Sequence, residues 1–293
     1  MEGHLLDLAR PDHPYLFGFL QGDGTLAKQK ARPNDGRGSL SVELEKGDVE
    51  LLKRFQRLLT CNSYLAPRTR TTNFKEDWES VVWRLYHQPL RLQLEELGIP
   101  VGRKSAIVKP PVVVHVENDY WRGLLDADGS LGLTGSGWPF VSFVTSSDYV
   151  ALGYLNYLQQ VIGKRKTSSR NERDSVYNIA VVKEDAQTVA QTLYYDGALA
   201  LDRKVSEART VLGWVRPPNL PMHSPLIRWL PEEDETLLVL GPKEAVEVLS
   251  RTIHATTLRH RALKRGGVKR PRRLIYAGMS AETLDHWNAP DNL

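Results

Sequence analysis

Two segments of the chain, 105 residues apart, carry nearly the same short pattern. YLFGFLQGDGTL at residues 15–26 and YWRGLLDADGSL at residues 120–131 match at six of twelve positions, and both contain Asp-Gly near their ends. Downstream, residues 41–55 and 141–155 each predict a short strand, an aspartate cap (Asp48 or Asp148) and an amphipathic helix. Because features repeated in one order indicate a duplicated unit, the sequence predicts two similar halves of roughly 100 residues each.

Composition narrows the class of protein. The chain has 293 residues, of which 41% are hydrophobic and 25% charged, which is typical of a soluble globular protein. A single cysteine, Cys61, excludes an internal disulfide and a multi-cysteine zinc site. No apolar run approaches the roughly 18 residues of a membrane helix, and the first residues do not resemble a signal peptide. We therefore expect an intracellular protein of the cytoplasm or nucleoid, whose net charge of +4 suits a polyanionic partner.

Periodicity predicts the order helix, two strands, helix, two strands, helix in each half. The expected strands lie near 26–32, 40–45, 64–71 and 80–87, and near 131–134, 139–145, 164–170 and 175–182. The predicted fold is α+β, with two duplicated αββαββα halves and a small all-α domain. The predicted boundaries are 1–112 and 113–216 for the halves, 217–225 for a proline-rich linker and 226–293 for a helical module with a basic tail.

Small residues recur on one face of each repeated helix. Gly18 and Gly22 are four residues apart, as are Gly123 and Ala127. A glycine within a helix costs about 1 kcal/mol relative to alanine, so two in one turn indicate a packing role. Small residues at this spacing let two helix backbones approach closely. We therefore predict that the two repeated helices pack against each other along these faces.

That packing would bring two acidic helix ends together. Asp23 and Asp128 fall at helix C-termini, where the helix dipole repels a carboxylate. With the terminal carbonyls of Gly22 and Ala127, they form an oxygen-rich set that suits Mg²⁺, with Mn²⁺ or Ca²⁺ as substitutes. The alternative is a pair of ordinary solvated aspartates. An EF-hand at DADGS is disfavoured because the later acidic ligand of that loop is missing.

The two segments resemble the LAGLIDADG motif of homing endonucleases. GLLDADG at residues 123–129 is close to the family pattern, whereas GFLQGDG at 18–24 has Gln21 in place of the first acid. The second acid, which binds metal in the family, is kept as Asp23 and Asp128. The resemblance covers about residues 15–215. It implies a single-chain, pseudo-symmetric clamp on duplex DNA that hydrolyses both strands across the minor groove and leaves short 3′ overhangs.

The resemblance also implies further catalytic residues. The family has a basic residue near each cleavage centre, and Lys104 and Lys204 match that position in the two halves. Such a lysine would stabilise the crowded phosphate charge; the alternative is an ordinary surface lysine. Lys46 and Ser146 follow the second strand of each half, where the family often has a polar residue that orders water.

Alternating basic residues predict DNA-facing strands, because residues two apart in a strand share a face. A basic concave sheet fits the major groove, where base edges are distinguishable. A solvated sheet face is the alternative. The residues expected to contact DNA are Lys28, Lys30, Arg32, Arg68 and Arg70 in the first half, and Lys164, Lys166 and Arg170 in the second.

The C-terminal segment predicts three short helices, over 231–240, 243–250 and 253–264, with Gly241 and Pro242 breaking the first from the second. Trp229, Leu237, Leu240, Val246, Leu249 and Leu258 are the expected core. Residues 251–273 hold nine Lys or Arg and no acid. The segment resembles Myb-like or homeodomain-like helix-turn-helix modules, which place the last helix in the major groove. The expected DNA contacts are Arg259, Arg261, Lys264 and Arg265; a basic solvated tail is the alternative.

Together these features predict a monomeric, site-specific double-strand DNA endonuclease with a long asymmetric target and no membrane partner. Two other functions remain open for the same fold. One is a DNA-binding transcriptional regulator that does not cleave, and the other is an intron RNA maturase. Retention of Asp23 and Asp128 argues against the regulator, since binding alone does not need the acids.

Overall fold

The computed structural model describes residues 5–28, 38–71, 76–218, 229, 231–265 and 275–276. The chain divides into two compact units. The first comprises Met1–Val215 with Leu274–Leu293, and the second is Arg216–Arg273. Among the described residues, no helix combines the length and the apolar character that crossing a membrane requires.

The first half of the larger unit builds an antiparallel sheet, here the first sheet, in the order β1-β2-β4-β3. Its elements follow the expected order, with a 3₁₀ turn at Lys46–Asp48 before α2. They are α1 (His13–Gly22), β1 (Thr25–Lys28), β2 (Gly38–Glu45), α2 (Val49–Leu58), β3 (Ser63–Arg70), β4 (Trp78–Leu85) and α3 (Gln88–Glu96).

The second half builds the second sheet, which has the order β5-β6-β8. Its elements are α4 (Glu117–Asp128), β5 (Gly129–Leu133), β6 (Pro139–Thr145), α5 (Asp148–Ile162), β7 (Thr167–Ser168), β8 (Tyr177–Val182), α6 (Glu184–Leu193) and α7 (Asp202–Leu212). The mixed α+β fold is confirmed. The strand expected over 164–170 is wrong in extent, because β7 has two residues and pairs with β9 (Ile275–Tyr276) rather than extending the sheet.

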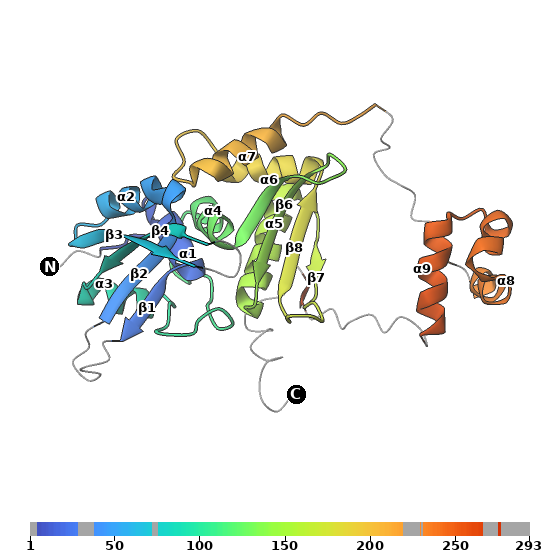
Figure 1. The fold of residues 1–293 in the computed structure, drawn as a ribbon, viewed down its shortest axis with the longest axis horizontal. Coiled ribbons are helices and arrows are strands. Elements are labelled where there is room, and N and C mark those ends of the chain that lie inside the picture. Colours follow the sequence, from blue (N-terminus) through green and yellow to red (C-terminus); the bar gives the residue numbers. More distant parts are fainter. Residues whose placement is uncertain are drawn as a thin grey trace. The chain divides into compact units, whose positions relative to one another are not determined.

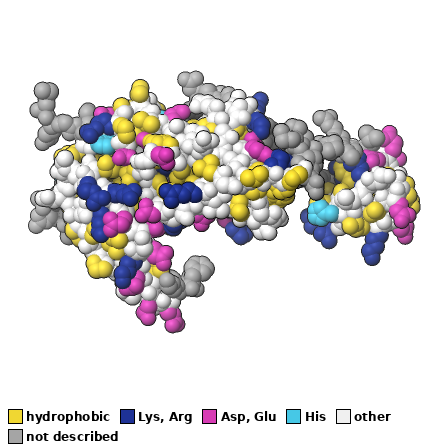
Figure 2. All heavy atoms as spheres, turned by 90° about the horizontal axis from the view of Figure 1, so that it is seen from above, with side chains coloured by type: hydrophobic (Ala, Val, Ile, Leu, Met, Phe, Trp, Pro, Cys, Tyr) yellow, Lys and Arg dark blue, Asp and Glu magenta, His cyan; other side chains and the backbone are white. Residues whose placement is uncertain are grey.

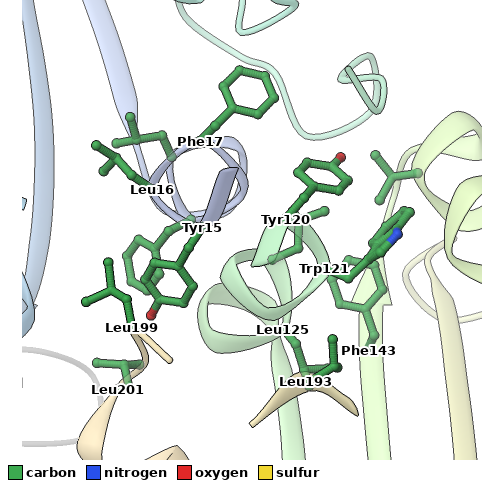
Figure 3. Close-up of a cluster of buried hydrophobic side chains, with 14 of the residues drawn as sticks. Tyr15, Leu16, Phe17, Tyr120, Trp121, Leu125, Phe143, Leu193, Leu199 and Leu201 are labelled. Atoms are coloured by element: carbon green, nitrogen blue, oxygen red, sulfur yellow. The ribbon is translucent and has the colours of Figure 1, made fainter. Parts of the chain in front are cut away.

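Each sheet has one buried face, as strand alternation requires. In the first sheet the buried side chains include Leu26, Leu40, Val42, Trp83 and Leu85, and in the second they include Leu131, Val141, Phe143, Ile179 and Val181. Helices cover these faces, and α1 and α4 lie side by side between the two sheets (Figure 1). Tyr15 of α1 points toward Leu199 and Leu201 of the second half, so the two halves share one core (Figure 3).

The glycine faces of α1 and α4 meet as predicted. A Cβ on Gly18 would lie 2.3 Å from the Tyr120 carbonyl oxygen, and one on Gly123 would lie 2.1 Å from that of Tyr15. Both distances are far below van der Waals contact, and the obstructing atoms belong to backbone. Only glycine therefore permits this helix approach, which sets the positions of both helix ends.

The second unit contains α8 (Pro231–Leu249) and α9 (Ile253–Lys264). Gly241 interrupts α8 with φ 80° and ψ 169°, so the helix has two segments that meet where the sequence predicted a break. Leu237, Ala245 and Thr256 are fully buried between the helices. Leu258 is 53% exposed, so its expected place in this core is wrong. Most of the predicted linker, residues 219–225, lies outside the described residues.

Candidate catalytic and metal site

The two acidic helix ends lie together. α1 ends at Gly22 with Asp23 as its cap, and α4 ends at Asp128. A Cβ on Gly22 would lie 2.4 Å from the Ala127 Cβ and 3.1 Å from Asp128 Oδ2. The absence of a side chain at Gly22 therefore lets the end of α4, with its carboxylate, approach the residue before Asp23.

The electrostatics of this pair are unfavourable without a cation. Burial raises the pKa of Asp23 to about 6, and the neighbouring Asp128 carboxylate adds to the rise, while Lys104 and Arg203 oppose it. Burial also raises the pKa of Asp128, against the opposing charge of Lys104. Two carboxylates held near each other at the negative ends of two helices favour binding of a positive charge.

Lys104 supplies one such charge. It lies in the loop after α3, is 8% exposed, and its ammonium donates to the Gln21 carbonyl at 2.5 Å and to the Gly22 carbonyl. These carbonyls lie at the end of α1, where the helix has no further amides to pair with them. Burial lowers the pKa of Lys104, although Asp128 and Asp23 both act to raise it. The predicted basic residue is therefore at the acidic pair.

Lys204 is not placed in the same way. It lies in the first turn of α7, is buried, and donates to the carbonyl of Gly129, just beyond Asp128. Burial lowers its pKa, and the carboxylate that most opposes this is Asp126. The two lysines that the repeat presents as equivalent thus contact the two helix ends differently, and Lys104 alone acts on the pKa of Asp128.

The donor set fits a hard divalent cation. Asp23, Asp128 and the carbonyls of Gly22 and Ala127 offer oxygen ligands, although Gly22 already accepts from Lys104. In the part of the chain that is described, no group of three or more His, Cys, Asp or Glu is arranged to hold a metal. A cation here would rely on two carboxylates, carbonyls, and oxygens of water or substrate.

The two predicted water-ordering residues differ in position. Ser146 lines a cavity of about 190 Å³ together with Asp128, Gly22 and Ser105. Lys46 instead pairs with Glu79 at 3.0 Å on the surface, with 64% of its side chain exposed. Of the two, Ser146 lies at the cavity beside Asp128, and its expected role in ordering water stays a prediction.

Two buried tyrosine hydrogen bonds connect α1 and α4, and the sequence analysis did not predict them. Tyr15 donates to Asp126 at 2.6 Å, and Tyr120, its counterpart in the repeat, donates to Gln21 at 2.7 Å. Asp126 also accepts from the Leu201 amide, whereas the Gln21 amide donates to the Lys109 carbonyl. An amide suits position 21 because its second partner, the Lys109 carbonyl, is an acceptor, whereas the second partner of Asp126 is a donor. Aligning the two copies of the repeat pairs position 21 with position 126 and could have located these hydrogen bonds.

No protein-family model matches the sequence, and no curated protein matches it. Solved structures do match. Two of these are LAGLIDADG endonucleases. I-AabMI, a LAGLIDADG meganuclease bound to uncleaved DNA, has 13% identity and a TM-score of 0.43 over 67% of this chain and 87% of that one. The LAGLIDADG homing endonuclease I-LtrWI, bound to target DNA, has 8% identity and a TM-score of 0.42 over 67% and 86%. Meganuclease I-SmaMI, bound to uncleaveable DNA, has 11% identity and a TM-score of 0.44 over 87% and 98%.

The predicted basic strand residues lie differently in the two halves. Arg68 and Arg70 are on β3, have 51% and 43% of their side chains exposed, and share the Glu43 carboxylate. Lys28 ends β1, but its side chain, with Lys30 and Arg32, lies outside the described residues. On the face in Figure 2, basic and acidic side chains are intermixed.

The predicted basic strand face of the second half is wrong. Lys164 and Lys166 lie in the turn after α5, and both pair with Asp185 of α6, at 2.5 and 3.2 Å. Arg170 pairs with Asp148 at 2.7 Å and donates to the Ser146 carbonyl. α5 ends at Ile162 with Gly163 as its cap at a φ of 65°, so Lys164 and Lys166 lie in the turn before β7, and Arg170 forms only an isolated bridge with Tyr177 of β8.

In the second unit, the candidate contacts divide into two kinds. Arg259 is held by Asp234 at 2.5 Å and stacks over Trp229, so it joins α9 to α8. Arg261, Lys264 and Arg265 are exposed at the end of α9, and no ion pair within the described residues includes them. Of the four candidate contacts, Arg261 and Lys264 at the end of α9 and Arg265 just after it are therefore the exposed ones.

The raised pKa of Asp23 predicts a pH-dependent stability. Between about pH 4 and 6 the folded state keeps a proton that the unfolded state releases, so this group destabilises the fold increasingly as pH rises. We expect Asp23→Asn to gain stability relative to the wild type over that window without divalent metal. Urea unfolding of both proteins at several pH values measures the difference. A stability difference between Asp23→Asn and the wild type that stays constant or shrinks as pH rises would contradict the raised pKa of Asp23.

Proposed function

We propose that this protein is a divalent-metal-dependent endonuclease that cleaves both strands of duplex DNA at a specific site, across the minor groove. The observation that carries the proposal is the pair of acidic helix ends, Asp23 and Asp128, brought together by glycine-mediated packing of α1 and α4. The motif resemblance of residues 15–26 and 120–131 supports it. Each half contributes one acid, so a single chain would cleave both DNA strands. A DNA substrate would place the protein inside the cell.

The residues have distinct roles in this proposal. Asp23, Asp128 and the carbonyls of Gly22 and Ala127 would hold Mg²⁺, or Mn²⁺ or Ca²⁺ in its place. When bound, the cation supplies Lewis-acid activation of water and stabilisation of phosphate charge. Lys104, whose ammonium already donates to carbonyls at the end of α1, would neutralise charge at the scissile phosphate. Ser146 would orient water in the cavity beside Asp128.

Cleavage of selected DNA tests the function. The protein is incubated with a randomised duplex library and Mg²⁺, and the new ends are sequenced. We expect one site family, broken in both strands, with short 3′ overhangs and no cleavage in EDTA. Bound but intact duplex at every Mg²⁺ and Mn²⁺ concentration would instead indicate a regulator, and preferential binding of structured RNA would indicate a maturase. Light scattering should give one chain per duplex.

We infer that the second unit adds phosphate contacts through α9. Each neutralised phosphate contributes about 0.9 to the slope of log affinity against log salt. Replacing Arg261, Lys264 and Arg265 together with Gln should lower that slope by about 2 to 3. Substitution is preferable to truncation, because a chain ending at the linker also loses β9, which pairs with β7 in the first unit. An unchanged slope would leave α9 as a solvated helix.

A further inference from the structure

The outward faces of the two sheets differ in charge. In the second sheet, alternation places the buried core residues on one face and leaves uncharged strand side chains on the other, which the Glu207 carboxylate of α7 reaches only at Gly132 of the edge strand β5. None of the outward positions of β5, β6 and β8 is charged. The residues that carry the argument are Ser142, Val144, Asn178, Ala180 and Val182. Val144 and Val182 are 37% and 47% exposed, so apolar side chains stand on the open face.

The first sheet presents guanidinium groups instead. Arg68 and Arg70 stand on the outward face of β3, opposite Ser80 and Trp78 of β4. The Glu43 carboxylate of β2 forms ion pairs with Arg68 at 3.4 Å and Arg70 at 3.5 Å, and it accepts a hydrogen bond from the Ser80 hydroxyl at 2.6 Å. Arg70 stacks over Trp78 with 4.9 Å between the guanidinium carbon and the ring centre. These contacts hold two exposed arginines in fixed directions.

Different faces suit different base edges. Arginine pairs with the O6 and N7 acceptors of guanine, whereas valine and alanine contact the thymine methyl group, and asparagine pairs with adenine. A guanine placed against Val144 or Val182 would lose water from its acceptors without gaining a donor, which is unfavourable. The Ser142 hydroxyl donates to Asn178 Oδ1 at 2.8 Å, which orients the carboxamide and leaves its second lone pair and its amino group for adenine.

We propose that the duplex recognised by this protein has two half-sites of different composition. The half beneath the second sheet is rich in A·T pairs, with thymine methyl groups against Val144, Ala180 and Val182. The half beneath the first sheet includes guanines opposite Arg68 and Arg70. This inference rests on the proposed function, since it assumes that the outward faces of both sheets meet DNA.

Selection from a randomised duplex library tests the proposal, using the full chain with Ca²⁺ and sequencing the bound fraction. Wild-type protein should select sites with one A·T-rich half and one half with fixed guanines. Ala180→Arg should bring guanine into the A·T-rich half with a preference of about 5- to 150-fold, while leaving the other half unchanged. Arg70→Val should remove a guanine preference only from the other half. Both positions are exposed, and thermal unfolding verifies that each variant is folded.

The outcomes separate the two claims. Selected sites with equal base composition in both halves, or an Ala180→Arg variant with an unchanged site, overturn this inference and leave the endonuclease proposal standing. If the selection enriches no duplex, the result contradicts the proposed function and therefore also this inference.

Discussion

Replacing either acidic helix end should abolish double-strand cleavage while DNA binding persists. Asp23→Asn and Asp128→Asn each remove one charged oxygen ligand from the pair at the ends of α1 and α4. Removing one preorganised electrostatic group from an active site typically lowers kcat by about 10²- to 10³-fold. Affinity for DNA should be unchanged or slightly higher, because one carboxylate fewer repels the phosphates. Cleavage of a supercoiled plasmid carrying the selected site separates nicked from linear product.

The matched control is Asp196→Asn, which removes an exposed carboxylate between α6 and α7. It should cleave at the wild-type rate. The single active-site variants should accumulate nicked plasmid, since each half would act on one strand. Linear product at the wild-type rate from both Asp23→Asn and Asp128→Asn would show that the acids are not catalytic.

The repeat in the sequence was sufficient to predict how the site is assembled. Matched glycines on two helices predicted a close approach, and the structure places Gly18 and Gly123 against opposing backbone carbonyls. Once those helices are in contact, Asp23 and Asp128 must be neighbours, because each lies at the same distance from its glycine. This part of the site depends on spacing within single helices, which a sequence displays directly.

Features that depend on loops could not be predicted. Whether position 21 or 126 needs a donor depends on a partner far along the chain, the Lys109 carbonyl in one half and the Leu201 amide in the other. The expected Asp48 cap has no side-chain capping bond, and its carboxylate accepts instead from Arg203 of the other half, at 3.0 Å. Ser147, rather than Asp148, caps α5 by accepting from the Val150 amide. Long-range partners redirected these side chains.

The alternating charges at 164–170 show a further limit of periodicity. Lys-Arg-Lys followed by Thr-Ser-Ser-Arg reads as a strand with a basic face. The same spacing also suits a turn in which Lys164 and Lys166 both reach Asp185. Since alternation alone does not distinguish an open sheet face from charges that are paired within a turn, only the helix end at Gly163 decides between them.

Adding one methyl group at the helix contact should strongly destabilise the protein. In Gly18→Ala the new Cβ would lie 2.3 Å from the Tyr120 carbonyl oxygen, and in Gly123→Ala it would lie 2.1 Å from that of Tyr15. Backbone atoms of a buried helix cannot move aside as a flexible side chain would, so α1 and α4 must separate. Overpacking typically costs about 1–3 kcal/mol and occasionally more. We expect these variants at or above the upper end because the obstructing atoms are backbone. That cost exceeds the gain of about 1 kcal/mol from the higher helix propensity of alanine.

Urea unfolding measures this cost, with Gly47→Ala and Gly135→Ala as controls, since a Cβ at either position meets no atom within 4 Å. The controls should keep the wild-type midpoint, whereas each helix variant should unfold at a markedly lower urea concentration. Cleavage should fall in the variants even where they remain folded, because separating the helices also moves Asp23 from Asp128. A Gly123→Ala variant as stable as the wild type would mean that the helices tolerate a wider separation, and the close approach would then not determine the distance between the acids.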